Sequence, residues 1–472
     1  MRGALALALL LAAPGTVGQT ALERQPGVWR GDFDGMLERR LVRVAVPYSR
    51  TLYFNDKGRQ RGLTADTLRD FEIDLNRRYP PKGRPITVAA LPMPRDRMLA
   101  ELAAGRVDLA AGNLTITAAR DRLVDFSMPI FEGVTEIVVT GPASPPLATL
   151  DDLSGQEVQV LRSSSYYGSL VALNARFRAA RRPQMKLTVL PETLEDEDMM
   201  DMLGAGLLGL IVVDDWKAGI WAGMRAKPKI RPRPDLAVSE AQSIGWAFRN
   251  GSPKLAEEVN RFIRTHPGSR NARVKEYPRY LKELRNVTAE SDWRRFERTI
   301  PLFRKYGARY GFDPLLLAAQ GYQESGLDQN ARSHPGAVGI MQLMPETGAA
   351  MKVGDIHQPE ANVHAGAKYL RQLHDRYFRG AELDEQNRTL FAIAAYNAGP
   401  SRVAALRTEA EKTGLDPNAW FGNVELVAAR RVGQEPVTYV RNVYKYYVAY
   451  KLQLDVLEAR RAAGGVVPPA KK

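Results

Sequence analysis

The sequence predicts a multidomain protein, with an α/β region in its N-terminal half followed by a mainly α-helical region. The chain has 472 residues, which is enough for about three folding units of ordinary size. Short β-branched apolar runs alternate with helical patterns up to about residue 267, as in α/β domains. Beyond that point strand signals vanish, and helical periodicity continues to about residue 460.

The first residues have the layout of a secretory signal peptide. Met1-Arg2 precedes an unbroken apolar run over 4–13, and small residues follow through Gly18, where we expect cleavage. A membrane anchor is disfavoured, because the run has only about half of the roughly 20 residues that span a bilayer. The protein is therefore expected to be exported.

Composition narrows the possible functions. The chain is 44% hydrophobic and 25% charged, as expected for a folded globular protein. It has no cysteine, so neither a disulfide nor a lipidated cysteine is possible. The net charge of +14 suits an anionic wall polymer or phospholipid headgroups, although general solubility explains it equally well. Nucleic acid is the least expected partner of an exported protein.

The elements of the α/β region follow from local patterns. Helices are expected at 68–78 and 95–104, the second closed by Gly105 as a C-cap. The expected strands cover 41–46, 88–91, 107–111, 135–140, 157–161, 186–190 and 208–213. The predicted organisation is a signal peptide at 1–18, an α/β domain at 38–266, a linker at 267–290, a helical domain at 291–458 and a disordered tail at 459–472.

One segment of the α/β region carries a family resemblance. The stretch 105–120 reads GRVDLAAGNLTITAAR and continues to VDFSMP at 124–129. It resembles the signature of the extracellular solute-binding proteins of family 3, and the resemblance covers roughly 38–265. It implies a periplasmic domain of two α/β lobes that bind an amino acid between them, with crossovers near 139–141 and 243–248.

The resemblance also implies a set of ligand-binding residues. Arg120 matches the residue that binds the ligand carboxylate, for which a guanidinium offers two parallel donors. Thr115 matches a hydroxyl donor, Ser164 a donor at a helix N-terminus, and Asp214 the carboxylate for the ligand ammonium. Each residue taken alone is more simply a surface ion pair or a cap.

Two departures from the family pattern leave the ligand open. The basic residue and aspartate usual before a strand of the second lobe are replaced over 206–209. The aromatic residue that stacks on the ligand is not evident, and Tyr48 and Tyr53 are the candidates.

A carboxylate at the end of an apolar helix is the main feature of the helical region. Asp313 and Pro314 predict a helix start, and an apolar run over 315–322 leads to Glu324 before Gly326 ends the helix. Burial would raise the pKa of this carboxyl group and suit it to general acid catalysis. The alternative is a solvated glutamate at a helix end.

Four ordered motifs surround Glu324 and resemble the lytic transglycosylases of glycoside hydrolase family 23. They are Glu324-Ser325 with Ser333, GAVGIMQLMP at 336–345, AYNAG at 395–399 and EPVTYV at 435–440. The resemblance implies a lysozyme-like fold that cleaves peptidoglycan, a lyase acting on the cell wall. The order of the two domains resembles one group of these enzymes in particular.

The same resemblance implies the role of each residue. Glu324 matches the catalytic acid/base, and Ser333, Gln342 and Met344 match residues that line the glycan site. The conserved pair that faces the acid corresponds to Tyr396 and Asn397, and the last motif ends in Glu435 and Tyr439. Alternatively, Tyr396 is an aromatic residue packed in the core, and Glu435 is a buried structural partner. Pro436 and Ile340 replace the threonine and leucine usual at their positions.

A single glutamate indicates a transglycosylase, in which one group protonates the glycosidic oxygen and then accepts the muramyl C6 hydroxyl proton. A hydrolytic muramidase, or a solute-binding sensor with an inactive helical domain, are the alternatives. Neither a cofactor nor a metal is expected, because His357, His364 and His374 have the spacing of surface residues.

The expected partners are peptidoglycan and, at the N-terminal domain, a muropeptide, peptide or amino acid. The expected location is the periplasm, with peripheral association with the outer membrane through a basic or amphipathic surface. The fusion also motivates the hypothesis that ligand closure around Arg120 changes access to Glu324.

Overall fold

The computed structural model describes residues 27–56, 59–80, 83–223, 229–266, 290–380 and 382–462. The predicted signal peptide and almost all of the predicted linker lie outside these residues. The last helix continues to Ala462, and the rest of the predicted tail is likewise outside them. The predicted domain boundaries stay a prediction.

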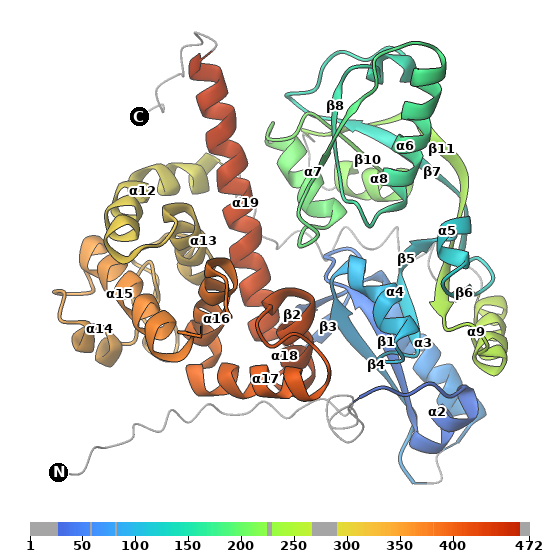
Figure 1. Ribbon diagram of the computed structural model, residues 1–472, viewed down its shortest axis with the longest axis horizontal. Coiled ribbons are helices and arrows are strands. Elements are labelled where there is room, and N and C mark those ends of the chain that lie inside the picture. Colours follow the sequence, from blue (N-terminus) through green and yellow to red (C-terminus); the bar gives the residue numbers. More distant parts are fainter. Residues whose placement is uncertain are drawn as a thin grey trace.

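A nine-stranded sheet runs through the described N-terminal half, in the order β4-β1-β5-β11-β7-β10-β8-β9 with β6 beside β11 (Figure 1). Its strands are β1 (Leu41–Pro47), β4 (Thr87–Met93), β5 (Leu109–Thr115), β6 (Asp125–Phe126), β7 (Phe131–Thr140), β8 (Glu157–Val160), β9 (Lys186–Val189), β10 (Leu210–Asp214) and β11 (Arg231–Phe248). A small ribbon pairs β2 (Phe54–Asp56) with β3 (Arg59–Arg61). Parallel strands buried on both sides explain the continuous apolar runs.

The sheet divides into two lobes joined by two long strands. β7 and β11 pair antiparallel from Arg231 opposite Thr140 to Ile244 opposite Phe131, and they cross from one lobe to the other (Figure 1). We define the first lobe as residues 29–130 with 243–265, and the second as 134–238. The helices of the lobes are α2 (Phe33–Arg39), α3 (Leu63–Arg78), α4 (Arg95–Ala103), α5 (Ala118–Asp121), α6 (Ser165–Ala179), α7 (Asp196–Gly204), α8 (Asp215–Gly223) and α9 (Pro253–Thr265).

The C-terminal region consists of helices. They are α12 (Glu290–Tyr310), α13 (Pro314–Ser325), α14 (Pro345–Met351), α15 (Pro359–Tyr377), α16 (Glu385–Ala398), α17 (Pro400–Lys412), α18 (Glu425–Arg431) and α19 (Glu435–Ala462). The 28-residue helix α19 packs against α13 and α16 on one side, and its other side faces the α/β lobes (Figure 1). The helical region therefore meets both lobes.

The buried core crosses from the first lobe into the helical region. Ala45 and Met98 of the first lobe belong to the same buried apolar cluster as Val427 of α18 and Val440 of α19. Farther along α19, Val448 joins the apolar cluster of the second lobe. The contact between the regions therefore includes a continuous apolar core.

The predicted fold class is confirmed, and the predicted strands are found with ends shifted by a few residues. After β11, the described residues contain no further strand, as expected. The eighteen-residue strand β11 was not among the predicted strands, and only a crossover near 243–248, at its end, was expected. Within the described residues, no helix combines the length and apolar character needed to cross a bilayer.

Candidate active site and interlobe site

Glu324 lies in the last turn of α13, where the sequence predicts it. The helix begins as expected: the Asp313 side chain accepts a hydrogen bond from the amide of Leu315 at 2.8 Å, and Pro314 takes the first helical position. It ends at Gly326, whose φ of 69° is left-handed and favours glycine. The predicted ends of this helix are thus confirmed.

The carboxyl group of Glu324 is partly removed from water and has one hydrogen-bond donor. Burial raises its pKa to about 7, and a hydrogen bond donated by the Tyr439 hydroxyl to Oε1 opposes the increase. Among the described residues, no neighbouring Asp or Glu contributes to this change. One carboxyl group is therefore poised to give up and take back a proton near neutral pH.

Tyr396 and Tyr439 are the two predicted site residues that the structure brings to Glu324. Tyr439 on α19 is buried, and both phenols interact electrostatically with the carboxylate. The Tyr396 hydroxyl donates to the carbonyl oxygen of Met341 at 2.8 Å. Since Tyr396 is half-buried and bonded to the loop, it is not simply a packed core aromatic.

Ser333 and Gln342 shape the loop that follows α13. The Ser333 hydroxyl oxygen accepts from the amide of Ala337 at 2.9 Å. Gln342 has a φ of 43° and donates through Nε2 to the carbonyl oxygen of Gly339 at 2.9 Å. Both polar side chains are thus engaged by their own loop, whereas the side chain of Met344 is 38% exposed.

Asn397 and Glu435 are exposed residues at helix ends. Asn397 lies near the end of α16, and Glu435 is the first residue of α19. The alternative that Glu435 is a buried structural partner is therefore wrong. Pro436 follows in the first turn of α19, where proline is tolerated because its nitrogen needs no hydrogen-bond partner there.

Sequence reasoning missed Asn362, which fixes the loop from α15. This residue is fully buried, and its Oδ1 accepts from the amide of Met341 at 2.8 Å. Its Nδ2 donates to the carbonyl oxygens of Val338 and Ile356, both at 2.9 Å. A lone asparagine within a helical pattern carries no local signal for this role.

Arg120 lies where the two lobes meet, but its guanidinium binds backbone. It donates to the carbonyl oxygen of Thr115 at 2.9 Å in the first lobe and to that of Ser163 at 2.8 Å in the second. The Thr115 hydroxyl lies 3.0 Å from the Ser165 hydroxyl, while Ser164 donates to the Leu161 carbonyl at 2.7 Å. Arg120 and Thr115 thus hold the two lobes to each other, whereas the Ser164 hydroxyl bonds within its own lobe.

Asp214 is also engaged by the protein itself. It is buried and accepts a hydrogen bond from Asn113 Nδ2 of the first lobe at 2.7 Å. The ammonium of Lys217 lies 3.6 Å from its Oδ2. The carboxylate predicted for a ligand ammonium therefore already has a cation of the chain beside it.

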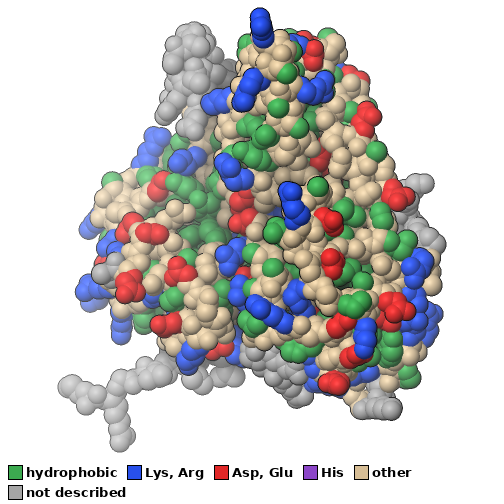
Figure 2. Space-filling model, turned by 45° about the vertical axis from the view of Figure 1, so that its right-hand side comes forward, with side chains coloured by type: hydrophobic (Ala, Val, Ile, Leu, Met, Phe, Trp, Pro, Cys, Tyr) green, Lys and Arg blue, Asp and Glu red, His purple; other side chains and the backbone are tan. Residues whose placement is uncertain are grey.

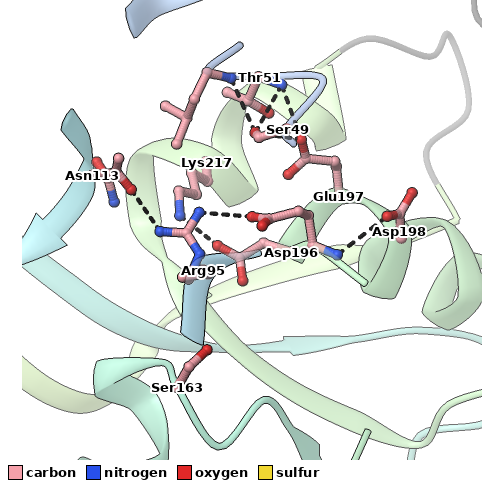
Figure 3. Close-up of polar contacts among 12 residues, drawn as sticks. Ser49, Thr51, Arg95, Asn113, Ser163, Asp196, Glu197, Asp198 and Lys217 are labelled. Atoms are coloured by element: carbon pink, nitrogen blue, oxygen red, sulfur yellow. Dashed lines mark hydrogen bonds and ion pairs between the residues drawn. The ribbon is translucent and has the colours of Figure 1, made fainter. Parts of the chain in front are cut away.

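A buried acidic run, missed in the sequence, completes the contact between the lobes. Residues 195–198 read Glu-Asp-Glu-Asp, and all four are buried at the start of α7. Arg95 of the first lobe pairs with Glu195 at 2.7 Å, and Lys217 pairs with Asp196. Figure 3 shows Ser49 and Thr51 facing Glu197, with Arg95 and Lys217 beside Asp196. Acidic runs are usually solvated, and these cations explain why this one is not.

The two aromatic candidates for ligand stacking face the helical region. The guanidinium of Arg441 on α19 lies 4.0 Å from the centroid of the Tyr48 ring. The Tyr53 hydroxyl accepts from Gln434 at 2.8 Å. Both residues thus contact the chain just before and within α19, and their stacking role stays a prediction.

The histidines form no metal site in the described part of the chain, where no group of three or more potential ligands is found. His357 is exposed and His364 half-buried. His374 is 2% exposed, and its ring nitrogens lie 3.0 Å from Asp375 and 3.1 Å from Glu385. The expected surface position of His374 is wrong, because these two carboxylates satisfy both ring nitrogens inside the domain.

Comparisons with known proteins match the two halves separately and the chain as a whole. Residues 42–273 match the bacterial extracellular solute-binding proteins, family 3, and residues 301–417 match the transglycosylase SLT domain. A solved structure, an ancestral arginine-binding protein bound to arginine, is 20% identical with a TM-score of 0.40, and the match covers 51% of this chain and 98% of that one.

Relatives with both halves extend over most of the chain. A membrane-bound lytic murein transglycosylase F of Ectopseudomonas mendocina is 29% identical over 86% of this chain and 83% of its own. Another of that name, from Desulfosudis oleivorans, is 29% identical over 78% of this chain and 81% of its own. The chain is therefore similar over most of its length to proteins named membrane-bound lytic murein transglycosylase F, and it has a family 3 solute-binding region followed by a transglycosylase SLT region.

Proposed function

We propose that the helical region is a peptidoglycan lytic transglycosylase that cleaves the β-1,4 bond between N-acetylmuramic acid and N-acetylglucosamine. The observation that carries this proposal is the single carboxyl group of Glu324, with a pKa raised to about 7 and no second carboxylate acting on it among the described residues. The family of the chain and the names of its relatives support the same activity.

The reaction needs one group that acts twice. Glu324 gives its proton to the glycosidic oxygen as the bond from that oxygen to C1 of the muramyl residue breaks. The resulting carboxylate takes the proton of the muramyl C6 hydroxyl, and O6 forms the new bond to C1. The product is a 1,6-anhydromuramyl end, no water is consumed, and Glu324 is protonated again.

The neighbours of Glu324 have defined parts in this proposal. Tyr439 holds Oε1, and Tyr396 stands where it can stabilise positive charge that develops on the sugar ring. Met344 is exposed for contact with the glycan, and Ser333 and Gln342 keep the loop in shape. Asn397 and Glu435 are exposed and are proposed as glycan contacts at the rim.

Mass spectrometry of the products tests the activity. Purified peptidoglycan is incubated with wild type and with Glu324→Gln, and anhydromuramyl ends are expected from wild type alone. Reducing ends would identify a hydrolytic muramidase instead. No cleavage by wild type would favour a sensor whose helical domain is inactive.

We further propose that the solute-binding region senses a wall-derived peptide, muropeptide or amino acid at the contact between its lobes. Arg120, Thr115, Ser164 and Asp214 are the proposed ligand residues. A ligand carboxylate would replace the two backbone carbonyls that Arg120 now binds, so binding requires the lobes to separate. Calorimetric titration with free amino acids and wall peptides, using wild type and Arg120→Ala, tests the site. Equal binding by both proteins would contradict it.

Helix α19 supports a coupling between this site and Glu324. It carries Tyr439, and two residues later Arg441 lies over Tyr48 of the first lobe and donates to the Thr193 carbonyl of the second at 3.4 Å. Lys445 pairs with Asp198 at 3.4 Å. If wall peptides change the cleavage rate of wild type and of Arg120→Ala identically, this coupling does not exist.

We propose a periplasmic location with peripheral attachment to the outer membrane. The names of the relatives and the signal-like N-terminus support this location. On the face shown in Figure 2, basic side chains are spread over the surface with acidic ones among them, and the chain carries a net charge of +14. Release of the protein from isolated membranes by high salt is expected, because salt screens attraction to anionic headgroups. Retention at 1 M salt would contradict this attachment.

A further inference from the structure

Gln320 is a buried amide one helical turn before Glu324. It lies on α13 among buried apolar residues such as Leu317 and Ala318, and its exposed fraction is 0%. Its Nε2 lies 3.4 Å from the Tyr439 hydroxyl, while its Oε1 has no hydrogen-bond partner among the described residues. Burying an amide with one end unpaired costs stability. A polar residue kept here at that cost points to a role in the site.

The chemistry of the three groups fixes the direction of each hydrogen bond. The Tyr439 hydroxyl has one proton, and it is directed to Oε1 of Glu324. A second hydrogen bond to the same phenol oxygen must therefore be accepted by it, so the amide of Gln320 is the donor. The three residues form a chain in which Gln320 donates to Tyr439 and Tyr439 donates to Glu324.

Resting on the function proposed above, we propose that Gln320 is a positioning residue for glycan cleavage. Its amide occupies a lone pair of the Tyr439 oxygen and so keeps the phenol proton on Oε1 of Glu324. The proton that Glu324 transfers is then held on Oε2, the oxygen left for the substrate. Without Gln320 the phenol can rotate and accept that proton from the acid, which takes it away from the glycosidic oxygen.

The hydrogen bond from Gln320 shifts the pKa of Glu324 in a definite direction. A donor to the phenol oxygen lowers the pKa of Tyr439 and strengthens it as a donor, and the bond from Tyr439 in turn lowers the pKa of Glu324. Tyr439 from α19 and Tyr396 from α16 are the titratable groups that interact with Glu324 in the described structure. On α12, Asp292 accepts from Tyr322 instead. Loss of Gln320 therefore raises the pKa of Glu324.

The test compares Gln320→Met with wild type, because methionine has a similar shape and no N–H donor. Activity requires a protonated Glu324 and falls at alkaline pH, so the alkaline limb of the pH–rate profile should move upward by about half a pH unit. The plateau kcat should fall roughly threefold to tenfold, as expected for one hydrogen bond. KM should change less, because Gln320 is fully buried and does not touch the glycan.

Two further variants separate positioning from a general loss of packing. In the Tyr439→Phe background, Gln320→Met should not move the alkaline limb of the pH–rate profile further, because the Tyr439 hydroxyl through which Gln320 acts is absent. Thr389→Val is the matched control: it removes a buried hydroxyl that donates to the Glu385 carbonyl at 2.9 Å, away from Glu324. This control should lower the melting temperature and leave the limb in place.

The following results decide whether Gln320 positions the proton of Glu324. An unmoved alkaline limb in Gln320→Met, or an equal shift in the Tyr439→Phe background, would overturn the role of Gln320 while leaving the transglycosylase intact. If wild type cleaves no peptidoglycan, the proposed function fails, and the hydrogen-bond chain is then tested without substrate. Stability should fall more between pH 5 and pH 8 in Gln320→Met than in wild type. Equal pH dependence would refute the chain.

Discussion

Replacing Glu324 by glutamine should inactivate the protein and stabilise it at alkaline pH. Burial raises the pKa of Glu324 from 4.5 to about 7, so the folded state holds a proton that the unfolded state gives up between these values. Each pKa unit corresponds to about 1.4 kcal/mol. Because the unfolded chain ionises this carboxyl group more readily than the folded protein, the free energy of unfolding is lower by about 1 kcal/mol at pH 5 and about 3 kcal/mol at pH 8. Glutamine is neutral and still accepts from Tyr439, so it avoids this loss.

The assay is urea unfolding of full-length wild type and Glu324→Gln at pH 5 and pH 8. The gain in stability of the variant should grow by about 2 kcal/mol between these two conditions. Glu297→Gln, at an exposed position on α12, is the matched control and should show no such growth. A gain that is equal at both pH values, or a variant that is less stable than wild type at pH 8, would refute the raised pKa.

Three more outcomes follow from the structure. Cleavage by wild type should decline as pH rises through about 7, because Glu324 loses the proton it transfers; an unchanged release of muropeptides up to about pH 9 would contradict this. Asn362→Ala removes three buried hydrogen bonds around Met341. It should lower the free energy of unfolding by about 2 to 4 kcal/mol and slow cleavage, which thermal melting and a cleavage assay measure. An unchanged melting temperature would show that other contacts hold the loop. Lys217→Met removes the ion-pair partner of buried Asp196 and leaves Arg95 as its neighbouring cation, so it should cost about 3 kcal/mol; a loss below about 1 kcal/mol in urea unfolding would show that Arg95 alone compensates the buried charge.

Local signals predicted the helix of the candidate acid. The cap at Asp313, the proline after it and the glycine at 326 are each within a few residues of what they control, and the structure confirms both ends of α13. The alternation of short strands and helices likewise gave the fold class. The roles of the site residues stay predictions, because motif resemblance assigns them.

Contacts between residues far apart in the chain could not be predicted from the sequence. β11 begins with Arg231-Pro232-Arg233, which reads as a loop, and it becomes a strand because β7 pairs along it. The acidic run at 195–198 reads as a solvated surface and is buried because Arg95, about 100 residues earlier, pairs with it. Neither partner is evident without the three-dimensional fold.

The continuous core between the first lobe and the helical region limits how the protein can be divided. Ala45 and Met98 share one buried cluster with Val427 and Val440, so cutting the chain between the two regions would expose apolar surface on both pieces. Such surface favours aggregation. An excised helical fragment would therefore need polar substitutions on α18 and α19 to remain in solution, and exchanging the solute-binding half between relatives would require the matching half of this core to be exchanged with it.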